Sequence, residues 1–178
     1  MYFKNVAALL SPLQSELKQA RPFHSPQQEA LLSILRTGAL LRHRITASLD
    51  PHGLSPEQYN VLRILRGAGE SGLPTLEVAA RLIEPTPAIT RLLDKLEAKK
   101  LVRRRRCADD RRQVLCWITG AGNDLLNKLD PLFAGSEHNL LAMLDAEDLQ
   151  RLISLLNRVR APLLPCPRTE KPVSKGAK

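Results

Sequence analysis

The sequence predicts a mostly α-helical protein with one small β-hairpin, and three observations support this fold class. First, 43% of the residues are hydrophobic but only 3% are aromatic, which favours helices packed through aliphatic side chains. Second, Ser-Pro and Thr-Pro pairs repeatedly precede amphipathic stretches, as expected at helix starts. Third, two short β-prone runs flank a polar turn late in the chain.

The N-terminal part divides into an extension and a long helix. Residues 1–24 form the predicted extension, with a helix that is interrupted or begins near Pro12. Ser25 then provides a cap, and Pro26 occupies the first helical position. Apolar residues recur at helical spacing beyond it. Residues 25–53 are therefore predicted to be one long helix closed by an Asp-Pro-His-Gly stop.

Three further helices are predicted in close succession. The first begins at Ser55 and ends in the Gly-Ala-Gly run that starts at Gly67. A short helix follows over 75–82, with Thr75 as its cap, and a longer one runs from a Thr86-Pro87 start to about Lys99. Since only a short turn separates the last two, the arrangement is that of a helix-turn-helix.

A hairpin and two more helices complete the predicted fold. Runs 101–106 and 113–119 read as strands around a polar turn, which makes the hairpin the wing of a winged helix-turn-helix. A Gly-Ala-Gly segment closes the wing, a helix covers about 123–138, and Asp145 caps the last helix. The winged helix-turn-helix region is therefore assigned to 54–120, the C-terminal helices to 121–162, and 163–178 to a basic, disordered tail.

The charge of the chain is concentrated in the wing. The chain carries 27 Lys and Arg against 18 Asp and Glu, a formal net charge of +9. Residues 99–112 contain eight of these cations and two anions, 8 − 2 = +6. Such a cluster favours a polyanionic partner, either nucleic acid or an anionic membrane surface. A solvated charge run is the alternative, and a basic helix with an apolar opposite face, as membrane binding requires, is not where the charge lies.

The position of this charge, beside a helix-turn-helix, favours duplex DNA. A helix fits the major groove, and a hairpin tip can place an arginine in the minor groove while flanking cations bind phosphates. Several predicted contacts have alternatives: Thr86 can serve only as a cap and Lys95 can be a solvated surface lysine. The predicted DNA-binding residues are Thr86, Pro87, Thr90, Arg91, Lys95, Arg105, Arg106, Asp110, Arg111 and Arg112.

Three motifs in this order resemble the MarR family. They are the run 54–62, the run 89–97, and Asp110-Arg111-Arg112 followed by Ile118-Thr119 and Gly122. The family's wing pattern is Asp-x-Arg, five residues, Leu-Thr and a nearby Gly, so Ile118 is the single departure within it. Lys100 stands where the family commonly has Gly, at the end of the recognition helix, and a lysine is tolerated there if the cap takes another geometry.

The resemblance implies a homodimer. Its N- and C-terminal helices form a dimerisation platform, and the two winged helices read a pseudo-palindromic operator. Asp110 is then the residue that braces the wing, and Arg112 the one that enters the minor groove; a local turn at Asp110 is the alternative. Family members often bind small aromatic or amphipathic ligands between platform and winged helix, and this chain is expected to do the same.

No catalytic residues, metal ligands or cofactor are predicted. The sequence has no Gly-rich phosphate loop, nucleophile elbow or His-Glu-x-x-His motif, and the region outside the winged helix is too small for a second, catalytic domain. Three widely spaced cysteines and the lack of a secretory signal or membrane-spanning run favour a cytoplasmic protein. Cys107, beside several arginines, is a candidate redox-sensitive thiol.

The function predicted from the sequence is therefore sequence-specific, duplex DNA-binding transcription regulation. The regulator is expected to be a repressor released by a small ligand or another signal, because a ligand that favours a different spacing of the two lobes weakens DNA binding. The alternative is a winged-helix protein-interaction or dimerisation module with only non-specific DNA affinity.

Overall fold

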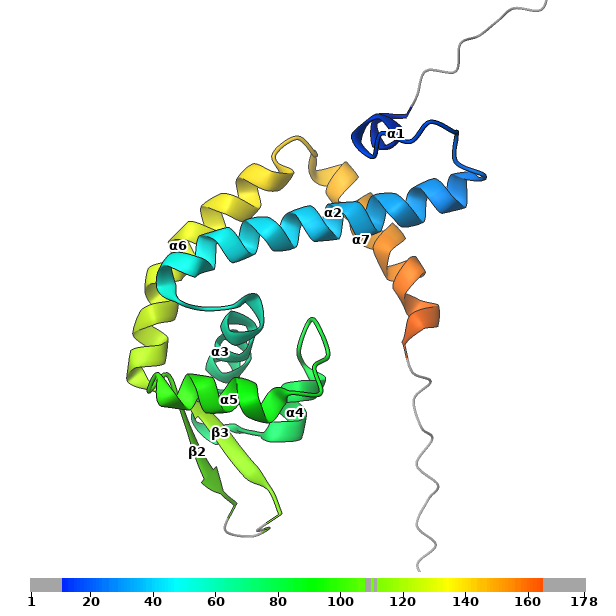
Figure 1. Ribbon diagram of the computed structural model, residues 1–178. Helices are drawn as coiled ribbons and strands as arrows, with labels where there is room; N and C mark the ends of the chain where they lie inside the picture. The colour runs from blue at the N-terminus through cyan, green and yellow to red at the C-terminus, as the bar shows by residue number, and fades with distance from the viewer. Residues whose placement is uncertain (1–10, 108–109, 111, 165–178) are drawn as a thin grey trace, which may run out of the picture. The chain divides into compact units, whose positions relative to one another are not determined.

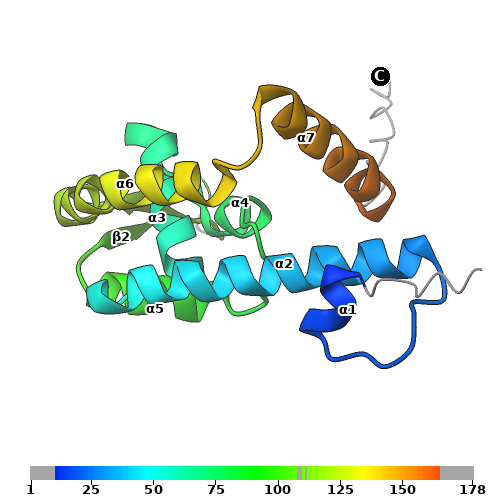
Figure 2. The same cartoon turned by 90° about the horizontal axis from the view of Figure 1, so that it is seen from above.

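The computed structural model describes residues 11–107, 110 and 112–164, and within them the chain is mostly helical with one small antiparallel sheet. The predicted fold class is confirmed. Two compact units divide the chain, Met1–Leu126 and Asn127–Lys178. In chain order the elements are α1 (Pro12–Glu16), α2 (Pro26–Leu49), α3 (Pro56–Ala68), β1 (Leu73–Pro74), α4 (Thr75–Ala80), α5 (Ile89–Ala98), β2 (Val102–Arg106), β3 (Val114–Ile118), α6 (Gly120–Leu141) and α7 (Ala146–Arg160), with 3-10 turns at Asp50–His52, Gly69–Ser71 and Ala161–Leu163 (Figures 1 and 2).

Side-chain caps set the start of the long helices. The Ser25 hydroxyl accepts a hydrogen bond from the Gln28 backbone N–H at 3.2 Å, at the start of α2. At the start of α3, Gln58 N–H donates to the Ser55 hydroxyl at 3.2 Å and the Gln58 side chain accepts from Ser55 N–H at 3.1 Å. Asp145 caps α7 in the same way. These predicted starts are confirmed, because a cap depends only on residues close in sequence.

The junction between the wing and α6 differs from the prediction. The helix begins at Gly120 instead of near Asn123, because the Thr119 hydroxyl caps it by accepting a hydrogen bond from Gly122 N–H at 3.1 Å. A Cβ on Gly122 would lie 2.4 Å from the Leu101 carbonyl oxygen. The glycine is therefore inside the helix, where it allows close approach of the backbone at Leu101, just before β2.

The sheet has three strands in the order β1-β3-β2, all antiparallel. The hairpin pairs Val102 with Ile118 and Arg106 with Val114, as its two predicted strands require. β1 adds a short third strand by pairing Leu73 with Cys116. Thr75, predicted as the cap of α4, is instead its first residue, and its hydroxyl donates to the Val114 carbonyl at 3.1 Å. The start of α4 is thus fastened to β3 of the wing.

The core of the first unit lies between α3, α4, α5 and the sheet. α5 packs against α3, α4 and β2, and α3 packs against β3. The apolar residues of each helix recur every three or four positions, so each helix buries one apolar stripe. The fully buried side chains of this core are Val61, Leu62, Leu65, Val78, Leu93, Leu96 and Cys116.

The residue at the end of α5 has the left-handed backbone conformation that usually requires glycine. Lys100 has φ +60°, its N–H donates to the Glu97 carbonyl at 2.8 Å, and Leu101 N–H donates to the Leu96 carbonyl at 3.0 Å. This is the Schellman arrangement. The expectation of another cap geometry is therefore wrong: the two hydrogen bonds hold the lysine in the left-handed region.

Trp117 anchors the base of the wing. Its side chain is 8% exposed, and its indole N–H donates to the Glu70 carbonyl at 2.9 Å. The Arg103 guanidinium lies over the ring, 4.4 Å from its centroid, at a distance typical of a cation–π contact. Gly72 lies so close that an added Cβ would be 2.4 Å from the indole nitrogen.

We expect Gly72→Ala to lower the free energy of unfolding by about 2–4 kcal/mol, because the new methyl group overlaps Trp117 and the residue has positive φ. Gly69→Ala is the matched control: its φ is also positive, but its Cβ would meet nothing within 4 Å, so about 1 kcal/mol is expected. Urea unfolding followed by tryptophan fluorescence measures both. Equal losses would contradict the packing described for Trp117.

Candidate nucleic-acid interface

The residues that α5 buries determine which of its residues are exposed. Ile89, Leu93 and Leu96 face the core, and the 3.6-residue repeat then directs Thr90 and Arg91 to solvent. Both are among the predicted DNA-binding residues. Their exposure in the first turn leaves them available to a groove.

The start of α5 was predicted two residues too early. Thr86 and Pro87 precede the helix, and the Thr86 hydroxyl accepts a hydrogen bond from the Ala88 N–H at 3.2 Å. This local turn satisfies the backbone in a non-helical conformation, so the helix begins at Ile89. Thr86 is half-buried and Pro87 is exposed. Both therefore lie in the turn that leads into the recognition helix.

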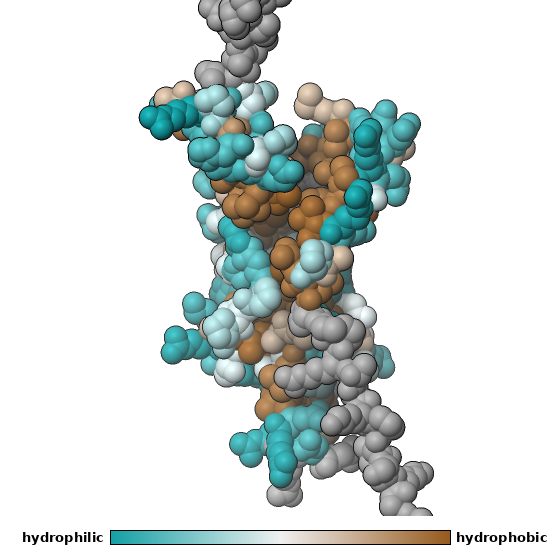
Figure 3. Space-filling model, turned by 90° about the vertical axis from the view of Figure 1, so that its right-hand side faces the viewer, coloured by the Kyte–Doolittle hydropathy of each residue, from teal (hydrophilic) through white to brown (hydrophobic). Residues whose placement is uncertain are grey.

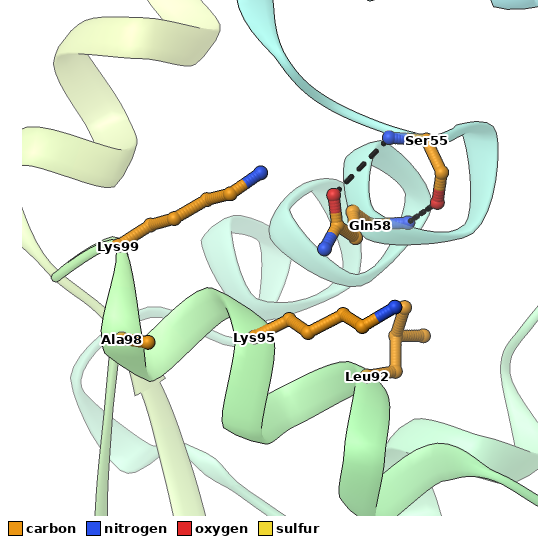
Figure 4. A pocket seen from close by; sticks show the side chains of 6 residues that line it. All are labelled: Ser55, Gln58, Leu92, Lys95, Ala98 and Lys99. Atoms are coloured by element: carbon orange, nitrogen blue, oxygen red, sulfur yellow. Dashed lines mark hydrogen bonds between the residues drawn. The ribbon is translucent and has the colours of Figure 1, made fainter.

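Lys95 lies one turn beyond Arg91 on α5, since residues four positions apart share one side of a helix. It lines a hollow of about 490 Å³ between α5 and the start of α3, together with Ser55, Gln58, Leu92, Ala98 and Lys99. Figure 4 shows the Lys95 and Lys99 side chains extending from α5 toward the start of α3. Lys99 also donates a hydrogen bond to the Gly53 carbonyl. The phosphate contact predicted for Lys95 stays a prediction.

The arginines of β2 fall into two classes. Arg104 is held by α5: its Nε donates to Glu97 Oε2 at 3.0 Å and its Nη2 to Asp94 Oδ1 at 2.6 Å. Arg103 stacks on Trp117, as described above. Arg105 and Arg106 lie further along the strand and are exposed.

The ion pairs of Arg104 reduce the net charge that the wing presents to a partner. The pKa of the Arg104 guanidinium is raised, chiefly by its hydrogen bond to Glu97 and further by Asp94, against the effect of burial. The formal +6 of residues 99–112 therefore includes one cation already neutralised by α5. The sequence reasoning missed the partners Asp94 and Glu97, although carboxylates three residues apart on one helix face were a usable signal.

The wing tip is braced through its backbone. Asp110 Oδ1 accepts from Arg112 N–H at 3.0 Å, and Asp110 Oδ2 accepts from the Gln113 side chain at 3.2 Å. Gln113 N–H also donates to the Asp110 carbonyl at 2.9 Å. The carboxylate thus fixes the backbone that carries Arg112, whose side chain is exposed. Arg111, also predicted to bind DNA, lies outside the described residues.

The two described cysteines have different environments. Cys107 is half-buried, and its N–H donates to the Gln113 carbonyl at 2.9 Å near the wing tip. Cys116 is fully buried in β3, and burial raises the pKa of its thiol. Cys116 is therefore a packing residue, and redox sensitivity of Cys107 stays a prediction.

Within the described ranges, no helix is both long and apolar enough to cross a membrane. The same part of the chain contains no group of three His, Cys, Asp or Glu side chains placed to hold a metal ion.

The packing of α3 to α5 on a β-hairpin defines a winged helix-turn-helix protein. A sequence model of the MarR family matches residues 52–113. HTH-type transcriptional regulator MhqR of Bacillus subtilis (strain 168) is 32% identical over 111 residues, which are 62% of this chain and 75% of that protein. The chain therefore belongs to the MarR family.

Solved structures agree with this assignment. The crystal structure of a MarR transcription factor from Planctomyces limnophilus is 36% identical, with a TM-score of 0.60 over 76% of this chain and 98% of that chain. The structure of S. aureus MepR in complex with DNA has the same fold, with a TM-score of 0.69 and 23% identity over 75% of this chain and 96% of that chain.

We expect Arg104→Met to lower the free energy of unfolding by about 1 kcal/mol, because it leaves Glu97 and Asp94 without their shared cation. Arg105→Met, one residue along the same strand, removes an exposed cation and should change stability by less than about 0.5 kcal/mol. Thermal unfolding at low and high salt measures both. A larger effect for Arg105 would contradict the division of the wing arginines.

Proposed function

We propose that this chain is a sequence-specific, duplex DNA-binding transcription regulator that acts as a homodimer. One observation carries the proposal: the first turn of α5 is exposed, the later turns of α5 contact β2 of the wing, and the outer arginines of that wing are also exposed. Exposed Thr90 and Arg91 suit the major groove, and Arg112, on a tip braced by Asp110, suits the minor groove. Arg105 and Arg106 then bind phosphates.

The proposed dimer rests on apolar side chains that the isolated chain leaves exposed. Figure 3 shows apolar side chains at the surface, and α2 contributes Leu31, Ile34, Leu35, Leu40 and Leu41. In the second unit, α7 exposes Leu152, Ile153, Leu155 and Val159. Exposed apolar residues at this density on a helix indicate a protein partner, and a second copy suits a two-fold symmetric operator with half-sites about one DNA turn apart.

Regulation by a ligand completes the proposal. The hollow between α3 and α5 combines apolar Leu92 and Ala98 with the ammonium groups of Lys95 and Lys99. Such a lining suits a small amphipathic or aromatic anion. A ligand bound there, against α5, favours a spacing of the two recognition helices that DNA does not accept, and thereby releases the regulator from DNA. In this proposal the regulator is a repressor. The proposed regulator is not an enzyme, uses no cofactor and acts in the cytoplasm. No catalytic role is assigned to any of these residues.

Arg112→Ala should weaken binding to the duplex that the wild type selects from a random pool by about 5- to 100-fold, and should lower the slope of log affinity against log salt by about one. Arg151→Ala, which removes an exposed cation from α7, is the control and should leave affinity within about two-fold. Fluorescence anisotropy over a salt series gives both quantities. Unchanged affinity for Arg112→Ala would remove the wing from the proposed interface.

Leu31→Glu combined with Leu35→Glu should convert the dimer into a monomer at about micromolar concentration, because each buried leucine contributes about 2 kcal/mol to an interface. Leu76→Glu, on α4, is the control: Leu76 is 80% exposed, and the variant should remain a dimer. Sedimentation equilibrium distinguishes the states. A wild-type chain that is monomeric at this concentration would contradict the dimer.

A further inference from the structure

One arginine of α2 joins three segments of the first unit. Arg42 Nη1 lies 3.5 Å from Glu57 Oε1, and its Nη2 contacts Glu84 Oε1. Glu57 is in the first turn of α3, and Glu84 is in the turn between α4 and α5. A planar guanidinium presents its donors in a rigid fork and can hold two carboxylates in a fixed arrangement, whereas an ammonium group is a point charge with freely rotating donors.

Two other contacts hold the same region. Ile83 N–H, next to Glu84, donates to the Asn60 side-chain oxygen at 2.9 Å. At the other end of α5, the Lys99 ammonium group donates to the Gly53 carbonyl, in the loop between α2 and α3. The recognition helix is therefore tied at both ends to the segments that adjoin α2.

The Arg42 contacts suit a role in the placement of these segments better than a role in stability. The side chains of Arg42, Glu57 and Glu84 are 47%, 33% and 49% exposed, and exposed ion pairs contribute little to stability. The pKa of the Glu57 carboxyl is lowered, chiefly by its hydrogen bond with Ser55 and in part by Arg42. Losing contacts of this strength changes the placement of the turn relative to α2 without unfolding the unit.

We propose that Arg42 is a positioning residue, which couples the placement of α2 to the placement of the recognition helix. The inference rests on the proposed function, because α2 is the helix assigned there to the dimer interface. A displacement of α2 moves the guanidinium, and the guanidinium moves Glu84 in the turn that leads into α5. Arg42 thereby relates the geometry of the dimer to the spacing of the two recognition helices.

The test compares Arg42→Ala with Arg44→Ala, which removes an exposed arginine two residues away on the same helix. At about 0.15 M salt, Arg42→Ala should bind the selected duplex about 3- to 10-fold more weakly than wild type, whereas Arg44→Ala should stay within about two-fold. Amide hydrogen exchange over residues 83–92 of the free protein should be faster in Arg42→Ala alone.

Reversing the pair gives a rescue that a merely structural role would not produce. Arg42→Glu places three carboxylates together and should weaken selective binding more than Arg42→Ala. Adding Glu84→Arg restores an opposite charge between α2 and the turn, so most of the lost affinity should return. Failure of this double variant to regain affinity would overturn the proposal.

Two other outcomes also overturn it. One is equal behaviour of Arg42→Ala and Arg44→Ala in affinity and exchange. The other is an equal loss for selected and unrelated duplexes, which would make Arg42 a phosphate contact. If the wild-type chain selects no duplex, the proposed function fails, and the exchange comparison still decides whether Arg42 positions α5.

Discussion

The burial of one face of α5 is the constraint on which the rest of the interface depends. Leu93 and Leu96 are fully buried where the helix packs against α3 and α4. Since successive residues of a helix differ by about 100°, fixing these two leucines also fixes the outward direction of Thr90 and Arg91. The same apolar contacts that stabilise the winged helix therefore determine which polar groups it presents.

In the wing, contacts within the fold likewise determine which charged side chains are exposed. A dense arginine cluster repels itself, and the fold removes part of that repulsion by binding Arg104 to Glu97 and Asp94 and by stacking Arg103 on Trp117. The Arg104 contacts fix the hairpin to α5, and the Arg103 contact joins its two strands. Arg105 and Arg106, further along the strand, are left exposed. A hairpin that binds in a groove needs both a rigid base and exposed charges near its tip.

The sequence predicted those parts of the fold that depend on neighbouring residues. The caps at Ser25, Ser55 and Asp145 and the two hairpin strands are determined locally, and all were found where expected. β1 was missed because two residues have no pattern of their own and become a strand only by pairing with β3. The start of α5 was misplaced because a hydrogen bond from Ala88 N–H to Thr86 competes with the helix.

The candidate site was predicted less completely for the same physical reason. Arg91 and Arg112 could be selected from the motifs that surround them, and both are exposed. The carboxylates of Asp94 and Glu97 indicated a place for a cation on α5, but the sequence could not tell which arginine they hold. The contacts of Arg42 could not be read either, because its partners come from other elements. Long-range ion pairs leave no periodic pattern, so the three-dimensional arrangement is needed to separate structural arginines from available ones.

Selection of duplexes from a random pool at about 0.15 M salt, where purely electrostatic binding is weak, tests the central claim most directly. The account predicts enrichment of one two-fold symmetric site with half-sites about one helical turn apart. Uniform recovery of unrelated sequences, lost on adding salt, would contradict it and would leave the basic wing as a non-specific patch on a protein-interaction module.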